Sequence, residues 1–131
     1  MSQPADSFVA SFTGANLLHG RAEPTPNGGA RVRLEDGTVV STADPAEGEV
    51  VLAVYPWDIT VASVLPRDSA LNVIRAPIRS VAELGNRVRL AIGPVTAEIT
   101  SESLARLGLA AGQQAYATFK ATGTRVVARH R

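Results

Sequence analysis

The sequence predicts an all-β protein made of two similar modules. Three landmarks recur at an offset of 56 residues: Asn16-Leu17-Leu18 with Asn72-Val73-Ile74, Arg31–Leu34 with Arg87–Leu90, and Gly37 with Gly93. Polar and apolar residues alternate within Arg31–Leu34 and Arg87–Ile92, the period of a half-buried strand. Two copies are too few for a solenoid. The repeat therefore indicates two small β units packed as one body.

The first residues are expected to form a short helix. In Pro4 to Phe12 the apolar side chains share one face, Asp6 can serve the N-terminus, and Gly14 can end the helix. We therefore expect a short N-terminal helix and linker over residues 1–14. A first half follows over residues 15–64 and a second over residues 65–131, with the loop Leu65–Asp68 at the boundary.

Further strands are expected where short apolar runs follow turn residues. These runs are Val50–Tyr55, Val95–Ile99, Ala115–Phe119 and Arg125–Ala128. Asn27-Gly28 is a strong hairpin-turn signal because both residues tolerate positive φ, and Glu35-Asp36-Gly37 is a second tight turn. Ser41–Gly48 is expected to be a loop.

One segment of the second half departs from the β pattern. Thr100-Ser101 supplies capping hydroxyls, Glu102 lies in the first turn, and Gly108 can end a helix of one or two turns. A short helix inserted between strands of a five-stranded unit is the layout of an OB-like barrel. The expected architecture is therefore two tandem OB-like modules, with one short helix in the second repeat.

Composition narrows the possible functions. The 131 residues contain no Cys, which excludes disulfides and thiolate catalysis, and no apolar stretch is long enough to span a bilayer. The formal charge is +1, so no long-range field would attract nucleic acid. No secretion signal is recognisable, and we expect a cytoplasmic protein.

Catalytic patterns are missing from the sequence. The single lysine, Lys120, is not part of a phosphate-binding Gly-rich loop, so the chain cannot by itself be a P-loop nucleotidase. His19 and His130 are not accompanied by carboxylates at metal-ligand spacing. We expect no enzymatic activity, no metal and no cofactor.

The positive signal is a set of polar motifs at the expected strand ends. Hydroxyls, backbone N–H groups at a helix start and one ammonium are the donors that a tetrahedral oxyanion requires. By spacing alone these motifs could equally be caps and turns. The motifs are Ser69-Ala70-Leu71-Asn72, Ile99-Thr100-Ser101 and Phe119-Lys120-Ala121-Thr122.

At these motifs the chain resembles a known family. Residues 69–128 are similar to the Mop-type (molybdate-binding, TOBE) fold, through the motifs just given and through Thr96-Ala97-Glu98-Ile99-Thr100. Residues 8–62 resemble the preceding half-module. Phe8–Phe12 and Gly14–Gly20 are similar to the segment that follows the ATPase domain in ATP-binding subunits of ABC importers. Residues 1–14 would then be a linker from an ATPase domain.

The resemblance implies an accessory, regulatory domain of an ABC-importer ATPase subunit. Such a domain would act with the ATPase domain and the membrane permease at the inner face of the membrane, and could bind molybdate or tungstate. The implied oxyanion site comprises Ser69, Leu71, Asn72, Thr100, Ser101, Lys120, Ala121 and Thr122. Leu71 departs from the family, which usually has Arg there, and loss of a charged donor should weaken binding about ten- to a hundredfold.

Two other functions are compatible with a double β module, and the sequence also predicts an oligomeric state. A free-standing cytosolic molybdate-binding protein would share the double module. An oligonucleotide-binding OB protein would need a basic groove with aromatic platforms, which the balanced charge does not favour, so we expect no nucleic-acid partner. We also expect a homodimer, because short strands with exposed edges and an apolar stripe, Val50–Tyr55, Ile59 and Val61, favour pairing.

Overall fold

The computed structural model describes residues 14–129, which fall into two compact units. Unit 1 runs from the N-terminal side to Val54 and resumes at Lys120, whereas unit 2 is Tyr55–Phe119. The expected N-terminal helix lies outside the described residues, as does His130.

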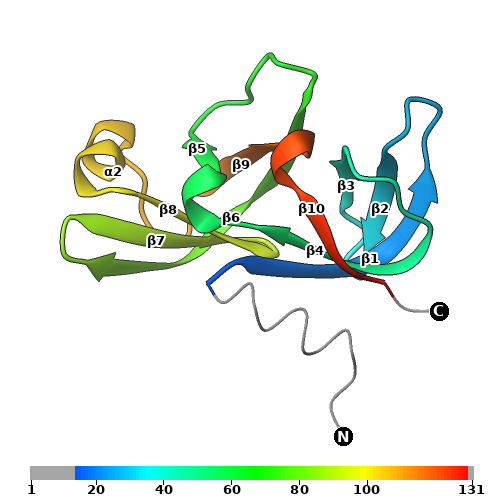
Figure 1. Ribbon diagram of the computed structural model, residues 1–131. Coiled ribbons are helices and arrows are strands. Elements are labelled where there is room, and N and C mark those ends of the chain that lie inside the picture. Colours follow the sequence, from blue (N-terminus) through cyan, green and yellow to red (C-terminus); the bar gives the residue numbers. More distant parts are fainter. Residues whose placement is uncertain (1–13, 130–131) are drawn as a thin grey trace, which may run out of the picture. The chain divides into compact units, whose positions relative to one another are not determined.

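Unit 1 is one five-stranded antiparallel sheet. Its strands are β1 (Asn16–Pro24), β2 (Ala30–Leu34), β3 (Val39–Thr42), β4 (Gly48–Val54) and β10 (Arg125–Arg129), in the order β10-β4-β1-β2-β3 (Figure 1). Both predicted turns are present. Gly28, at φ 98°, lies in the turn between β1 and β2, and Gly37, at φ 90°, lies between β2 and β3. Positive φ at these positions favours glycine.

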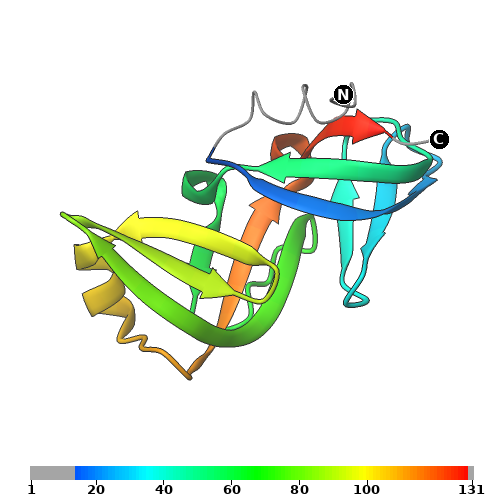
Figure 2. The same ribbon diagram turned by 90° about the horizontal axis from the view of Figure 1, so that it is seen from below.

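Unit 2 repeats this order. It contains the 3-10 helix η1 (Pro56–Asp58), β5 (Thr60–Ala62), β6 (Leu71–Leu84), β7 (Arg87–Ile92), β8 (Val95–Thr100), helix α2 (Ser101–Leu107) and β9 (Gln114–Lys120). The strand order is β5-β9-β6-β7-β8. Figure 2 shows β6, in green, bending strongly along its length, and α2 contacts β8 and β7. The 3-10 helix η2 (Ala121–Gly123) follows β9.

The two sheets exchange their last strands relative to the sequence halves. β5 follows β4 in the chain but pairs with β9, and β10 follows β9 but pairs with β4. Relative to the halves 15–64 and 65–131 expected from the repeat, residues 55–64 lie in unit 2 and residues 120–131 in unit 1. A short 3-10 turn precedes the exchanged strand in each case, and each sheet is complete only with residues from both halves of the chain.

The alternating strands bury one face, as their period predicts. In β2, Val32 and Leu34 are buried while Arg31 and Arg33 are exposed; β7 buries Val88, Leu90 and Ile92. Each fully buried Val or Leu side chain contributes about 1.5–3 kcal/mol. The first sheet is therefore polar on its outer face and apolar within.

The apolar stripe expected to mediate association lies in the core. Val50–Val54 are at most 3% exposed, Ile59 is 3% exposed and Val61 is 6% exposed. The inference of an exposed stripe was wrong: β4 pairs with β1 and β10 at its two edges, and the side chains of Val50–Val54 are buried on both faces of the strand. Any association of this chain must use another surface.

The predicted inserted helix is confirmed together with both its caps. The Thr100 hydroxyl accepts a hydrogen bond from the Ser103 N–H at 3.0 Å, and Gly108 takes the left-handed conformation after Leu107. No strand was predicted at β1, β3, β5 or β6. In the expected loop Ser41–Gly48, residues 41 and 42 belong to β3 and Gly48 is the first residue of β4.

Candidate functional site

A polar cavity of about 330 Å³ lies within unit 1, where the β1–β2 turn, the end of β3 and η2 meet. Its volume is at the lower end of the range for small-ligand sites. The charged side chain that lines it is Arg31. The complete lining is Thr25, Asn27, Gly29, Ala30, Arg31, Ser41, Thr42, Ala43 and Ala121.

The turn that forms one wall is held in place locally. The Thr25 N–H donates to the Gly29 carbonyl at 2.9 Å, and the Gly28 N–H donates to the Thr25 carbonyl at 3.1 Å. Gly29 itself lies against β3: a Cβ at this position would be 2.3 Å from the Thr42 carbonyl oxygen. Only glycine permits this close approach of the two backbones. The position of this wall therefore depends on the turn hydrogen bonds and on glycine at position 29.

A second wall is made by η2, which hydrogen bonds attach to β3. The Ala43 N–H donates to the Ala121 carbonyl at 3.1 Å, and the Thr42 hydroxyl donates to the Thr124 carbonyl. Thr42 and Thr124 are both buried. These contacts bring a segment about eighty residues away in sequence to the end of the hairpin.

Asp44 anchors the start of β10 beside this wall. Its Oδ2 accepts hydrogen bonds from the Arg125 Nε at 2.8 Å and from the Val126 N–H at 2.9 Å. Burial raises the pKa of the Asp44 carboxyl, but these two donors and the charges of Arg125 and Arg129 outweigh it and hold the pKa below the ordinary value. Asp44 is therefore a charged structural anchor.

The cavity offers donors suited to an anion. Arg31, which forms no ion pair with a carboxylate of residues 14–129, lines the cavity, and Asn27 adds an amide group, while the Thr25 hydroxyl donates to the Asn27 Oδ1 within the turn. A guanidinium with a neighbouring amide can bind a small oxyanion through charge-assisted hydrogen bonds. Among residues 14–129, no group of three His, Asp or Glu side chains could hold a metal ion.

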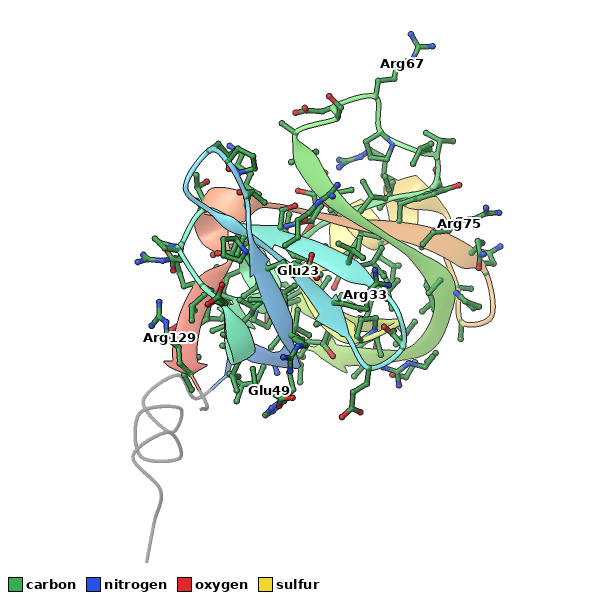
Figure 3. The ribbon with its side chains drawn as sticks, turned by 90° about the vertical axis from the view of Figure 1, so that its right-hand side faces the viewer. Glu23, Arg33, Glu49, Arg67, Arg75 and Arg129 are labelled. Atoms are coloured by element: carbon green, nitrogen blue, oxygen red, sulfur yellow. The ribbon has the colours of Figure 1, made fainter. Side chains whose placement is uncertain are left out.

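The outer face of this sheet carries charges of both signs. Arg21 lies opposite Arg33 on β2 and opposite Glu49 on β4, with an Arg21–Glu49 ion pair at 3.9 Å. Glu23 lies opposite Arg31 in the strand register. Figure 3 labels Glu23, Arg33 and Glu49 on this part of the molecule. Alternating charges do not make the single-sign groove that nucleic acid requires.

The predicted oxyanion residues are divided between the two units. Ala121 is half-buried and lines the cavity of unit 1, flanked by the exposed Lys120 and Thr122. The remaining five belong to unit 2. At the start of β6, Ser69 is exposed, Leu71 is half-buried and Asn72 is buried with a polar partner.

Thr100 and Ser101 do not join the start of β6 within unit 2. Thr100 lies opposite Arg87, at the end of β7 that faces Leu84, so it is at the far end of β6 from Leu71. Its hydroxyl also donates to the Ser103 hydroxyl at 2.9 Å, and the Ser101 N–H donates to the Asn86 carbonyl at 2.9 Å. In this structure these groups serve the helix cap.

Sequence reasoning missed the cavity residues other than Ala121. Thr25 and Asn27 were assigned only to a hairpin turn, and Arg31 only to the polar face of a strand. The signal available in the sequence was Arg31, which lies near the start of β2, close to Gly28 and Gly29 of the turn. The sequence does not predict that β3 and η2 form the other walls of the cavity beside Arg31, because those contacts depend on the register of β2 with β3.

Comparison with known proteins finds sequences similar to this chain. Residues 68–126 match the family model described as the TOBE domain. The chain is 34% identical over 130 residues, 95% of its length, to the molybdate/tungstate import ATP-binding protein WtpC of Pyrococcus abyssi. It is 34% identical over 103 residues to the molybdenum import ATP-binding protein ModC of Bordetella parapertussis. The chain spans 36% and 27% of the length of these two relatives.

A solved structure shares the fold. The molybdate-bound form of the cytoplasmic molybdate-binding protein ModG superposes with a TM-score of 0.78 at 20% sequence identity. The match covers 89% of this chain and 98% of the ModG chain. No helix of residues 14–129 has the length and apolar character needed to cross a membrane.

Proposed function

Because residues 68–126 form a TOBE domain, homologous to the C-terminal region of molybdate and tungstate import ATP-binding proteins, we propose that this chain is an accessory domain of such a subunit and binds a tetrahedral oxyanion. The similarity to the Pyrococcus abyssi protein, which extends over nearly all of this chain, carries the proposal. Its role would be to sense molybdate or tungstate and to regulate uptake by the importer.

The unit 1 cavity supports the binding part of this proposal. It is lined by Arg31, by polar residues of the β1–β2 turn and by Ala121 of the predicted set. Lys120, adjacent to Ala121 in the sequence, adds the only ammonium side chain of the protein. The other predicted residues remain proposals separate from this cavity: Thr122, which follows Ala121, and in unit 2 Ser69, Leu71 and Asn72 at the start of β6, with Thr100 and Ser101 at its far end.

The finer fold that we propose for each unit is an OB-like barrel. In unit 1 the Ala43–Ala121 and Thr42–Thr124 hydrogen bonds link the edge strand β3 to the segment that leads into β10 at the opposite edge. In unit 2 the bend of β6 supports the same arrangement (Figure 2). Such a curved sheet would present its strand ends around one opening.

Calorimetric titration with molybdate, tungstate and sulfate tests the binding function. We expect saturable binding of molybdate or tungstate, weakened about ten- to a hundredfold by Arg31→Gln, because a charged hydrogen bond contributes about 1.5–3 kcal/mol. Arg67→Gln, in an exposed loop of unit 2, is the matched control and should leave the affinity unchanged. Absence of heat with all three anions would contradict an oxyanion-binding role.

The ATPase subunit would supply the remaining functions in the full system. We propose that this chain works with an ATPase domain and a membrane permease at the cytoplasmic face of the membrane, and hydrolyses no ATP itself. Saturable ATPase activity in the pure protein would contradict this assignment. The cargo would be the anion that the titration selects.

A second candidate is a free-standing molybdate-binding protein. The fold match to ModG, which spans almost the whole ModG chain, favours this candidate. The two proposals differ in the size of the native protein. An immunoblot of native cells at about the mass of this chain would favour the free-standing form, whereas a band nearly three times larger would favour the subunit.

A further inference from the structure

β6 extends beyond β9, the strand that pairs with it on the side away from β7. The Ile78 N–H donates to the Gln113 carbonyl at 2.8 Å, and the Ile78 carbonyl accepts from the Gly112 N–H at 2.8 Å. Both partners precede β9, which begins at Gln114, so the β9 side of β6 is covered only as far as Ile78. Within residues 14–129, no strand pairs with residues 80–84 on the side away from β7.

The backbone groups on this open side can be identified from the hairpin. Leu84 lies opposite Arg87 across a two-residue turn, with Gly85 at φ 69°. The residues that close such a turn direct their N–H and C=O groups at each other, and the direction alternates along the strand. Ala82 therefore also bonds toward β7, whereas Val81 and Glu83 direct two N–H and two C=O groups outward.

The same segment is exposed in its side chains. All residues from 79 to 84 are exposed, including Val81 at 36% and Leu84 at 50%. Exposed sheet edges are usually protected by charged side chains, Pro, a β-bulge or a covering element. Residues 80–84 contain neither Lys nor Pro and a single charged residue, Glu83, and the β-bulge lies before them, between Ile78 and Ser80. This edge is therefore able to receive another strand.

We propose that residues 80–84 of β6, hereafter the β6 edge, pair in antiparallel fashion with the β6 edge of a second copy of this chain. With Ala82 on the twofold axis, Val81 of each copy lies opposite Glu83 of the other. Each such pair exchanges two N–H···O=C bonds, so all four outward groups of each copy are satisfied. The segment is thus self-complementary, and the pairing extends the sheet of unit 2 across two molecules.

Cysteine cross-linking tests this register directly. The protein has no Cys, so Ala82→Cys introduces a single thiol. Residues opposite each other in a non-hydrogen-bonded pair have Cα atoms about 4.5 Å apart, within the disulfide range. Mild oxidation of Ala82→Cys should give a reducible dimer. The control Ser80→Cys should not, because its two copies would be roughly 13 Å apart along the strands.

A charge pair at the same edge provides an independent measurement. Val81→Glu places like charges opposite Glu83, whereas Val81→Lys places opposite charges there. Light scattering over a concentration series should show dimerisation of the wild type, about two- to thirtyfold weaker in Val81→Glu and correspondingly stronger in Val81→Lys. Leu17→Glu is the matched control, because Leu17 is also 36% exposed but lies on β1, which is paired on both sides.

Three results would overturn the proposal. They are a wild type that stays monomeric at every concentration, equal cross-linking of Ser80→Cys and Ala82→Cys, and equal association of the two Val81 variants. Melting curves that match the wild type would confirm that the variants are folded, as their exposed positions lead us to expect. Molybdate titration is a separate measurement, so loss of the dimer and loss of the proposed binding function are distinguishable.

Discussion

Replacing Asp44 with Ala should loosen β10 from unit 1 and lower the stability of the protein. The change removes the acceptor of two hydrogen bonds, from the Arg125 Nε and the Val126 N–H. The Arg125 side chain is 66% exposed, so its ion pair is screened by solvent and contributes little to stability. The half-buried Val126 N–H loses a charged acceptor, which costs about 1.5 kcal/mol.

The loss is therefore mainly that of the Val126 hydrogen bond, about 1.5 kcal/mol, or a melting temperature lower by ~5 °C for a chain of this length. Differential scanning calorimetry measures the shift. Arg125→Gln is the matched comparison because it removes only the exposed donor, and it should cost less than half as much. Equal losses in the two variants would refute the assignment of the main contribution to the Val126 N–H.

The effect should also depend on pH. The folded-state pKa of Asp44 is lower than the unfolded value, so the unfolded chain binds the proton more readily. The stabilisation by Asp44 is complete above the unfolded pKa, near 4, and is lost as the pH falls through the folded-state pKa. The difference in melting temperature between wild type and Asp44→Ala should therefore persist at pH 7 and shrink below about pH 4.

Three further predictions address the cavity, the predicted site and the exchanged strand. Gly29→Ala should lower the free energy of unfolding by about 1–3 kcal/mol and weaken oxyanion binding, because its Cβ would be 2.3 Å from the Thr42 carbonyl oxygen. In the control Gly123→Ala the new Cβ meets no atom within 4 Å, so melting temperature and anion affinity should not change. Leu71→Arg should strengthen molybdate binding about ten- to a hundredfold, and Lys120→Ala should weaken it. A folded Leu71→Arg variant that binds molybdate no more tightly would contradict the prediction that the start of β6 belongs to a binding site. Truncation after Thr124 removes β10 from the Val51, Ala53, Val127 and Ala128 cluster, so amide exchange should accelerate in β4 while β7 stays protected; equal acceleration in both would contradict separate units.

Local patterns in the sequence predicted several elements well. β7 has the predicted bounds, Arg87–Ile92, because period-2 alternation there is uninterrupted and both ends carry turn residues. The helix α2 was identified from Thr100 and Gly108, since caps act on neighbouring backbone groups. The homologous half-modules were recognised from repeated motifs. These features depend on interactions over a few residues, which a sequence displays directly.

β6 illustrates what local patterns miss. Its fourteen residues include Pro77, and residues 79–84 are exposed on both faces, so neither period nor composition marks it as one strand. A strand of this kind is maintained by its pairing with β7 and β9. The same absence of pattern concealed the β6 edge, whose open backbone groups depend on where β9 ends.

The sequence by itself determined that the chain is mostly β, where its turns and short helix lie, and which family its second half resembles. Only the tertiary structure decided that β5 and β10 exchange between the sheets, that Val50–Val54 is core, and that Ala121 meets Arg31 and Ser41 around one cavity. The physical reason is the range of the interactions. Turns and caps are set by near neighbours, whereas strand pairing and burial join residues such as Thr42 and Thr124, which are far apart in sequence and meet only once the chain has folded.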